Sequence, residues 1–339
     1  MTDGELAALA ATLRAGRGFA HKRDIGEVMA TLAQSLPGGA ADLAQAVAIG
    51  DDCAAIPDPS GHGWLLFAIE GFLDDFVQAM PRFAGWCGVM VNLSDICAMG
   101  GRPIAVVDAL WSRGGPDGQE VLRGMADASA CYGVPIVGGH SNSRSDRAAL
   151  AVAILGRANR LLTSFNARPG DTLVMAIDLR GAYEEPHPFW NASTSAPAQR
   201  LRDDIELLPR LAESGLCDAA KDISNAGAVG TALMLLECSK VGAQIEVSAI
   251  PRPPGVALQR WLQTFPSFGF VFSVRPAQVE AVQAHFQAHG IDCASVGTVT
   301  ADTRVWLRDG DCQALLWDVA TEPFITAGAS ARPEGFHAG

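Results

Sequence analysis

Hydrophobic residues along this chain gather in short continuous runs that alternate with longer segments of mixed character. The run Trp64–Ile69 is wholly apolar, as is typical of strands buried on both faces, and Ile104–Leu110 predicts another strand. Arg82–Met99 and Asp117–Tyr132 have the length of helices, and glycines followed by Pro103 end the first of these. Because strands and helices alternate, the pattern predicts an α/β or mixed α+β fold.

The N-terminal part contains two glycine-rich breaks. The pattern predicts a helix to about Arg14, a break over residues 14–18 and a second helix over Asp24–Leu36. Further on, a strand over Val134–Val137 is expected to end in a turn that begins with Gly138.

The second half of the chain predicts a separate unit. Thr172–Ile177 predicts a strand and Ala198–Ser214 predicts a helix. Gly181–Pro197 between them shows no periodicity, and loops of this length within domains are often functional. Because 339 residues are typical of two packed cores, we expect two domains, over residues 1–158 and 159–330.

Charge and cysteine content narrow the class of protein. The formal net charge is −12 and the isoelectric point is near 5.0, so the chain repels nucleic acid phosphates and anionic membranes at long range. The eight cysteines form no CxxC pair and no zinc-ligand spacing with histidine, which indicates reduced thiols. No signal peptide and no apolar run of about 18 residues are evident. We therefore expect a cytoplasmic protein that binds neither nucleic acid nor membranes.

Two segments carry carboxylates of the kind that bind hard cations. Asp51 and Asp52 follow Gly50, and adjacent carboxylates can hold a divalent ion, although aspartates that cap a turn explain this segment better when it is taken alone. Asn92 and Asp95 are three residues apart and share a helix face among apolar residues. A buried carboxylate at that position needs a metal or another partner, and a backbone cap explains Asp95 equally well.

Two further segments are candidates to face a phosphate. In Gly138–Ser141 the glycines let the backbone approach a phosphate, and His140 would face the same ligand, although glycine pairs after strands are common. Asp222 precedes Ser224 and Asn225, either of which can cap the next helix. A helix N-terminus also favours anions, but plain capping is the simpler explanation.

Together and in this order, the four segments resemble the motifs of the AIR synthetase superfamily. That superfamily includes aminoimidazole ribonucleotide synthetase, selenophosphate synthetase and thiamine-monophosphate kinase, and the resemblance is closest to the last. The family's motifs GDDAA, NLSDxAAMGxxP, GGDT and DxSDG are matched at residues 50–54, 92–103, 138–141 and 222–226, with one departure in each of the first two and two departures in each of the last two. Glu70 stands where the family has a metal-binding aspartate.

The resemblance implies a two-domain AIR synthetase-like fold, in which N-terminal strands pair across a homodimer and the C-terminal domain is an α/β sandwich. It also implies that ATP binds with Mg²⁺ between the subunits. The metal ligands carried over by position are Asp51, Asp52, Glu70, Asp95 and Asp222. The nucleotide contacts carried over are Lys22, Asn92, Gly138, Gly139 and Ser141. His140 and Asp222 take the catalytic positions.

Departures from the family pattern affect the acceptor half of the site. His140 and Asn225 each replace an aspartate, so the site should hold fewer or differently placed metal ions. Tyr183, His187 and Trp190 indicate an acceptor that stacks on an aromatic face. We therefore expect ATP- and Mg²⁺-dependent phosphoryl transfer to a small-molecule acceptor. Two alternatives remain open: activation of an amide oxygen, as in aminoimidazole ribonucleotide synthetase, and nucleotide binding without catalysis.

Overall fold

The computed structural model describes residues 1–33, 50–72 and 74–326, and the chain divides into two units. The five-stranded unit comprises residues 52–161 and 193–213. The seven-stranded unit comprises the described residues within 1–51, 162–192 and 214–339. This grouping differs from a single boundary near residue 158, because the start of the chain packs with the later unit. Both units combine strands and helices, as their alternation along the sequence predicts.

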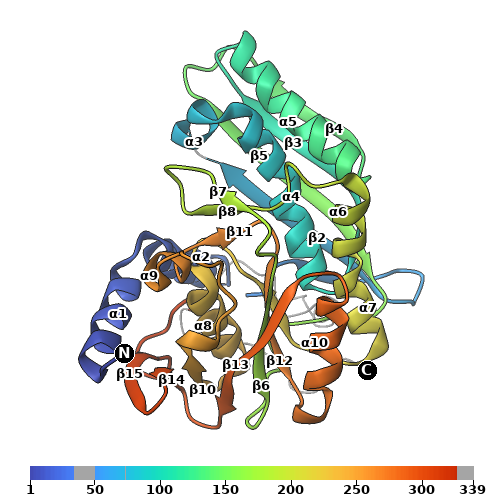
Figure 1. The fold of residues 1–339 in the computed structure, drawn as a ribbon. Coiled ribbons are helices and arrows are strands. Elements are labelled where there is room, and N and C mark those ends of the chain that lie inside the picture. Colours follow the sequence, from blue (N-terminus) through green and yellow to red (C-terminus); the bar gives the residue numbers. More distant parts are fainter. Residues whose placement is uncertain (34–49, 73, 327–339) are drawn as a thin grey trace. The chain divides into compact units, whose positions relative to one another are not determined.

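The five-stranded unit is a mixed sheet in the order β1-β2-β5-β3-β4 (Figure 1). Its strands are β1 (Ala54–Pro57), β2 (Trp64–Phe72), β3 (Arg102–Trp111), β4 (Ile136–Asn142) and β5 (Ala149–Ala158). Its helices are α3 (Asp74–Ala79), α4 (Pro81–Ala98), α5 (Pro116–Tyr132), α6 (Ala198–Ile205) and α7 (Leu207–Ser214). Only β3 and β4 pair in parallel within the described sheet. Since α4 packs on β2, β3 and β5, and α5 and α6 pack on α4, α4 is the central helix of this unit.

Glycines let α4 lie close to the sheet. A Cβ atom at Gly88 would come 2.8 Å from Val152 Cγ2, and one at Gly156 would come 2.7 Å from Ile96 Cγ2. Asn92 lies between Gly88 and Ile96 at helical spacing, so its side chain also faces the sheet. The apolar sequence of α4 follows from this position, because the helix is covered by the sheet and by other helices.

The opposite face of the same sheet carries exposed apolar side chains. Leu66 on the α4 side of β2 is buried, whereas Phe67 and Ile69 on the other side are 49% and 64% exposed. The register places Leu155 of β5 beside Phe67, and Leu155 is exposed as well. We call the following set the bare face: Ile56, Phe67, Ile69, Val107 and Leu155.

The seven-stranded unit contains one large and one small sheet (Figure 1). The large sheet has the order β15-β14-β10-β13-β6-β12-β9. Its strands are β6 (Thr172–Ile177), β9 (Ala220–Asp222), β10 (Gly242–Glu246), β12 (Gly269–Val274), β13 (Asp292–Thr300), β14 (Arg304–Asp309) and β15 (Cys312–Asp318). The small sheet consists of β7 (Ala182–Tyr183), β8 (Phe189–Asn191) and β11 (Phe265–Pro266). The helices of this unit are α1 (Asp3–Ala15), α2 (Arg17–Ala33), α8 (Gly227–Ser239), α9 (Leu258–Trp261) and α10 (Val279–Gln287), with 3₁₀ turns at Val247–Ala249 and Pro276–Gln278.

Helices cover both faces of the large sheet. Val271 of β12 belongs to the main core together with Leu233 of α8. Phe272, on the other face of β12, lies against Phe286 of α10, with 5.2 Å between the ring centroids. Alternate residues of one strand therefore serve two cores, and the unit is an α/β sandwich.

The start of α2 differs from the expectation. The helix begins at Arg17 rather than Asp24, and the break shrinks to Gly16, whose N–H donates to Leu13 O. Gly18 lies inside α2, where a Cβ atom would come 2.0 Å from Asn225 O. This glycine thus permits close packing and does not form a turn. The predicted end of the helix at Leu36 lies outside the described residues.

Several other elements also differ from the expected pattern. Gly181–Pro197 contains β7 and β8, and β15 was not predicted. The helix expected over Ala198–Ser214 is divided into α6 and α7 at Glu206. Pro209 explains the division, because proline is tolerated only in the first turn of a helix. Among the helices that the structure describes, none is long and apolar enough to cross a membrane.

Candidate functional site

Helix α4 buries a polar side chain against the sheet. Asn92 is fully buried, and its Nδ2 donates a hydrogen bond to Gly88 O at 2.8 Å. Within the described part of the chain, Asn92 Oδ1 has no hydrogen-bond partner. An unsatisfied buried polar atom costs about 1–3 kcal/mol, so this oxygen is a natural contact for a ligand or a cation.

Two carboxylates of the five-stranded unit lie close together. Asp95 of α4 is 6% exposed, and Asp52 lies in the bend before β1. A carboxylate oxygen of Asp52 and one of Asp95 are within 4.8 Å of each other. Like charges at this distance repel unless a cation or a proton lies between them. Because hard oxygen donors suit Mg²⁺, and Asn92 Oδ1 lies one turn earlier on α4, these residues fit a magnesium ion.

The other predicted metal ligands occupy different positions. Glu70 lies on the α4 side of β2, opposite Val152 in the register, and is not part of the close group that Asp52 and Asp95 form among the described residues. Asp51 belongs to the seven-stranded unit, where Ser164 holds both of its carboxylate oxygens.

Asp222 ends strand β9 of the seven-stranded unit. It is buried and pairs with Phe270 of β12 in the sheet register. The N-cap of the following helix α8 is Ala226, without a side-chain hydrogen bond, so neither Ser224 nor Asn225 caps the helix as expected. Instead, the Asn225 carbonyl forms the surface against which α2 packs.

The glycine pair after Val137 does not form a turn. Gly138 and Gly139 lie inside the edge strand β4, which pairs in parallel with β3. A Cβ atom at Gly139 would come 2.2 Å from Asp108 Oδ1. Position 139 therefore requires glycine, because a larger residue would clash with the Asp108 side chain. A Cβ atom at Gly138 would have open space around it, with Val107 Cγ1 at 3.8 Å.

Strand alternation separates the residues of this motif. Successive residues of β4 point to opposite faces, so His140 and Ser141 cannot face one ligand from the same side. His140 lies opposite Ala109 in the register, on the face of Val107 and Trp111. Its ring lies 6.4 Å from the Trp111 ring, centroid to centroid. The catalytic residue expected from the motif therefore belongs to the bare-face side of the sheet.

Asp108 is a candidate that the sequence interpretation missed. It lies on the α4 side of β3, with Val152 and then Glu70 beside it in the sheet register. Burial raises the pKa of the Asp108 carboxyl above its usual range, an effect that a hydrogen bond from its own backbone partly offsets. The signal in the sequence was a single charged residue within the apolar run Ile104–Leu110.

The aromatic residues expected at the acceptor side lie in the small sheet. Trp190 is buried and its Nε1 donates to Asp178 O at 3.1 Å. The Tyr183 hydroxyl is hydrogen bonded to Thr264 Oγ1 at 2.8 Å, and its ring packs edge-on against Trp190. His187 is stacked on Phe189, with centroids 5.2 Å apart. These side chains are thus partly engaged in packing, and acceptor binding stays a prediction for them, as nucleotide contact does for Lys22 on α2.

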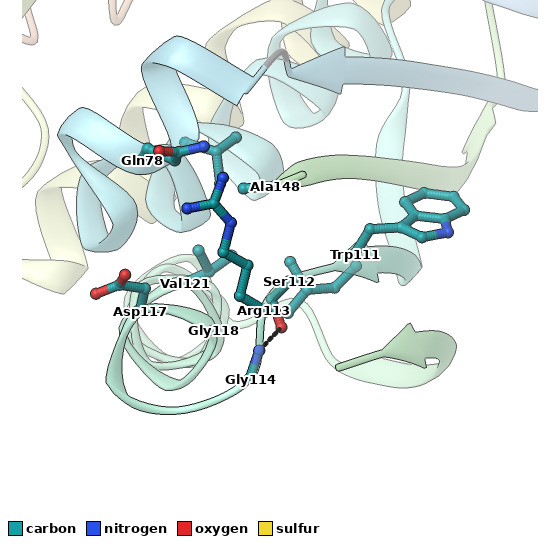
Figure 2. Close-up of a pocket in the computed structure, with 11 residues that line it drawn as sticks. Gln78, Trp111, Ser112, Arg113, Gly114, Asp117, Gly118, Val121 and Ala148 are labelled. Atoms are coloured by element: carbon teal, nitrogen blue, oxygen red, sulfur yellow. Dashed lines mark hydrogen bonds between the residues drawn. The ribbon is translucent and has the colours of Figure 1, made fainter. Parts of the chain in front are cut away.

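A small cavity lies at the end of β3 (Figure 2). Its volume is about 50 Å³, far below the hundreds of Å³ of a typical drug-sized ligand pocket. Leu110 and Trp111 line one side and Val121 of α5 lines another, and Ser112 Oγ accepts a hydrogen bond from Gly114 N. The site residues that the sequence predicts do not line it, and it is too small for a nucleotide.

Comparison with known proteins identifies the class to which this fold and its carboxylate pair belong. Residues 50–158 match the N-terminal domain of AIR synthase related proteins, and residues 176–309 match their C-terminal domain. The chain therefore belongs to the AIR synthase related family, a superfamily of ATP-using enzymes with a mixed α/β, two-domain fold.

Particular relatives span most of the chain. An uncharacterized protein of Synechocystis sp. is 47% identical over 307 residues, which cover 90% of this chain and 94% of that protein. A thiamine-monophosphate kinase of Synechococcus elongatus is 28% identical over 299 residues, covering 79% of this chain and 88% of the kinase. The solved structure of T. maritima PurL complexed with ADP has a TM-score of 0.67 at 21% identity, covering 82% of this chain and 46% of the PurL chain.

Proposed function

We propose that this chain binds ATP with magnesium and transfers a phosphoryl group to a small-molecule acceptor. The observation that carries the proposal is the Asp52–Asp95 pair, whose carboxylate oxygens lie within 4.8 Å of each other. A buried and a half-buried carboxylate this close suit a divalent cation. Membership of the AIR synthase related family supports the nucleotide, and the similarity to a thiamine-monophosphate kinase supports phosphoryl transfer.

Asp52 and Asp95 hold the magnesium ion in this proposal. Asp222 is the third ligand by its place in the family's motif order, and Glu70 and Asp51 stay predicted members of the set. Bound magnesium would neutralise charge on the phosphates. Catalysis of this kind depends mainly on positioning and charge neutralisation, which a rigid helix such as α4 provides.

The remaining roles follow the resemblance and are part of the same proposal. Asn92 has the strongest support among the nucleotide contacts, because its buried oxygen has no partner in the described chain. The other proposed nucleotide contacts are Lys22, Gly138, Gly139 and Ser141. The proposed catalytic residues are His140 and Asp222, and the proposed acceptor contacts are Tyr183, His187 and Trp190.

We also propose that the bare face is covered by a second copy of this chain. Phe67 and Ile69 are largely exposed apolar residues in the middle of a sheet, and Leu155 and Val107 continue the same surface. Exposed apolar patches of this kind mark association surfaces. His140 lies on this side of the sheet, so in a homodimer it would be enclosed rather than open to solvent.

Turnover of ATP in the presence of candidate acceptors tests the proposed reaction. The purified protein is incubated with ATP, magnesium and a panel of small hydroxyl- and phosphate-bearing acceptors, and products are identified by mass spectrometry. We expect Mg²⁺-dependent formation of ADP and a phosphorylated acceptor, lost in Asp52→Asn and Asp95→Asn. Turnover that survives chelation of divalent ions, or that both variants retain, would contradict the proposal.

A second candidate reaction is activation of an amide oxygen. The resemblance to aminoimidazole ribonucleotide synthetase motivates this alternative, whereas the likeness to PurL, at 21% identity, shows the fold alone. The two reactions differ in their need for a nitrogen donor. If ADP forms only when a nitrogen-bearing co-substrate is added, the amide-activating reaction replaces phosphoryl transfer to an acceptor. If ATP binds but no acceptor gives turnover, the chain is a nucleotide-binding protein without catalysis.

A further inference from the structure

The tandem aspartates belong to one turn but have different surroundings. Ser164 donates to both oxygens of Asp51: its N–H reaches Oδ2 at 2.8 Å and its hydroxyl reaches Oδ1 at 2.6 Å. Asp52, one residue later, instead presents a carboxylate oxygen to Asp95. Two hydrogen bonds from one residue to both oxygens fix the direction of the Asp51 carboxylate.

Ser164 is itself held by the last turn of α8. Its carbonyl accepts a hydrogen bond from Ser239 Oγ at 2.7 Å, and Ser239 Oγ accepts one from Ala167 N at 3.0 Å. The neighbouring Cys238 Sγ donates to Gly50 O at 3.5 Å. The end of α8 therefore contacts both the segment that carries Ser164 and the residue that precedes Asp51.

We propose that Ser164 is a positioning residue of the tandem-aspartate turn: Asp51, instead of binding the metal as its motif predicts, anchors the turn through Ser164, and Asp52 carries the metal. This inference rests on the proposed function, because it assigns the metal to Asp52. Adjacent Cα atoms are about 3.8 Å apart, so fixing Asp51 limits where the Asp52 carboxylate can reach. A turn that is already ordered does not lose conformational freedom when the cation binds, and its affinity is correspondingly higher.

Ser273 provides a matched control for Ser164. Both serines are buried in the seven-stranded unit, and Ser273 Oγ donates to Asp171 Oδ2 at 2.7 Å. Removal of either hydroxyl leaves an aspartate with one donor fewer, so both Ser→Ala variants should lose similar stability. Only Ser164 bonds the aspartate next to the proposed metal ligand.

The test uses Mn²⁺ as the probe, with free Mn²⁺ measured by electron paramagnetic resonance in titrations of the full chain. We expect Ser164→Ala to raise the Mn²⁺ dissociation constant about fivefold, which is roughly 1 kcal/mol. Ser273→Ala should melt at a similarly lowered temperature and bind Mn²⁺ within about twofold of the wild type. Ser164→Thr, which keeps the hydroxyl, should restore Mn²⁺ binding.

Two outcomes would overturn the inference, and they are distinguishable. If wild-type protein binds Mn²⁺ and Ser164→Ala binds it equally well, or Ser273→Ala weakens it as much, Ser164 does not position the site. If the wild type binds neither Mn²⁺ nor an ATP analogue with magnesium, the proposed function fails as well. Should Ser164→Ala not fold, Ser164→Cys, which replaces the hydroxyl with a weaker donor, should weaken Mn²⁺ binding in the same direction, and unchanged binding would count against the inference.

Discussion

At the scale of single residues, helix α4 places two polar side chains in a buried environment. Asn92 and Asp95 lie three residues apart on a helix whose other buried residues are apolar or glycine. Their burial costs free energy that a purely structural helix would avoid by using apolar side chains. We interpret this cost as the physical sign of a binding site, because a cation would satisfy both the carboxylate and the amide oxygen.

Substitution of Asp95 tests this interpretation. Asp95→Asn keeps the shape of the side chain and removes its charge, so the fold should persist while Mg²⁺-dependent binding of ATP weakens tenfold or more, about 1.4 kcal/mol. Calorimetric titration with a non-hydrolysable ATP analogue measures the affinity, and Asp203→Asn on the exposed side of α6 is the control. Unchanged affinity with a normal melting temperature would remove Asp95 from the ligand set.

Asp108 gives a prediction about pH. Burial raises the pKa of its carboxyl in the folded chain, so the folded state binds this proton more tightly than the unfolded state does. Its contribution to stability therefore falls as the pH rises from about 4, the ordinary aspartate range, through the raised native value. Asp108→Asn should be more stable than the wild type near neutral pH, and this advantage should vanish below about pH 4. Urea unfolding of both proteins across this range measures the effect, and parallel pH profiles would exclude it.

At the scale of elements, the sequence predicts helices and strands well because their signals are local, but β2 is buried on one face only, since Phe67 and Ile69 are exposed. α4, α5 and β6 begin and end within about two residues of the predicted limits, since apolar runs, prolines and glycines mark them. β4 was expected to end at Val137, but it continues through Asn142 because β3 pairs with it along this length. β8 likewise pairs with β11, which is distant in sequence, whereas β7 and β15 pair with the nearby strands β8 and β14.

Local sequence signals also predict only part of the candidate site. The pairing of Asp52 with Asp95 could be predicted from motifs, because both lie in segments with a recognisable pattern. Ser164 and Asp108 could not, because their roles depend on contacts with Asp51 and Gly139, which no local pattern reports.

The two glycines of β4 should respond differently to substitution. A methyl group at Gly139 would overlap Asp108 Oδ1 and lie 2.8 Å from the Asp108 carbonyl oxygen. Gly139→Ala should therefore destabilise the fold by roughly 1–3 kcal/mol, as overpacking does. Gly138→Ala, which meets open space, should change stability by about 0.5 kcal/mol or less. Equal melting temperatures for the two variants would contradict the position of Asp108 over Gly139.

At the scale of the whole molecule, the bare face predicts self-association. Ile69→Lys places a charge in the middle of an apolar surface, so it should convert a homodimer to a monomer at micromolar concentration. Leu315→Lys on β15 is a matched control, because Leu315 is also an exposed apolar strand residue, at 44%. Sedimentation velocity distinguishes the two species. A wild-type protein that is monomeric under these conditions would contradict the proposed homodimer.

We propose above all that this chain holds ATP through magnesium and the carboxylates of Asp52 and Asp95. Calorimetric titration of the wild-type protein with a non-hydrolysable ATP analogue, in magnesium and then with divalent ions chelated, tests it most directly. We expect saturable binding in magnesium, with an affinity at least about tenfold weaker after chelation. Absence of nucleotide binding in magnesium, or equal affinity after chelation, would contradict it.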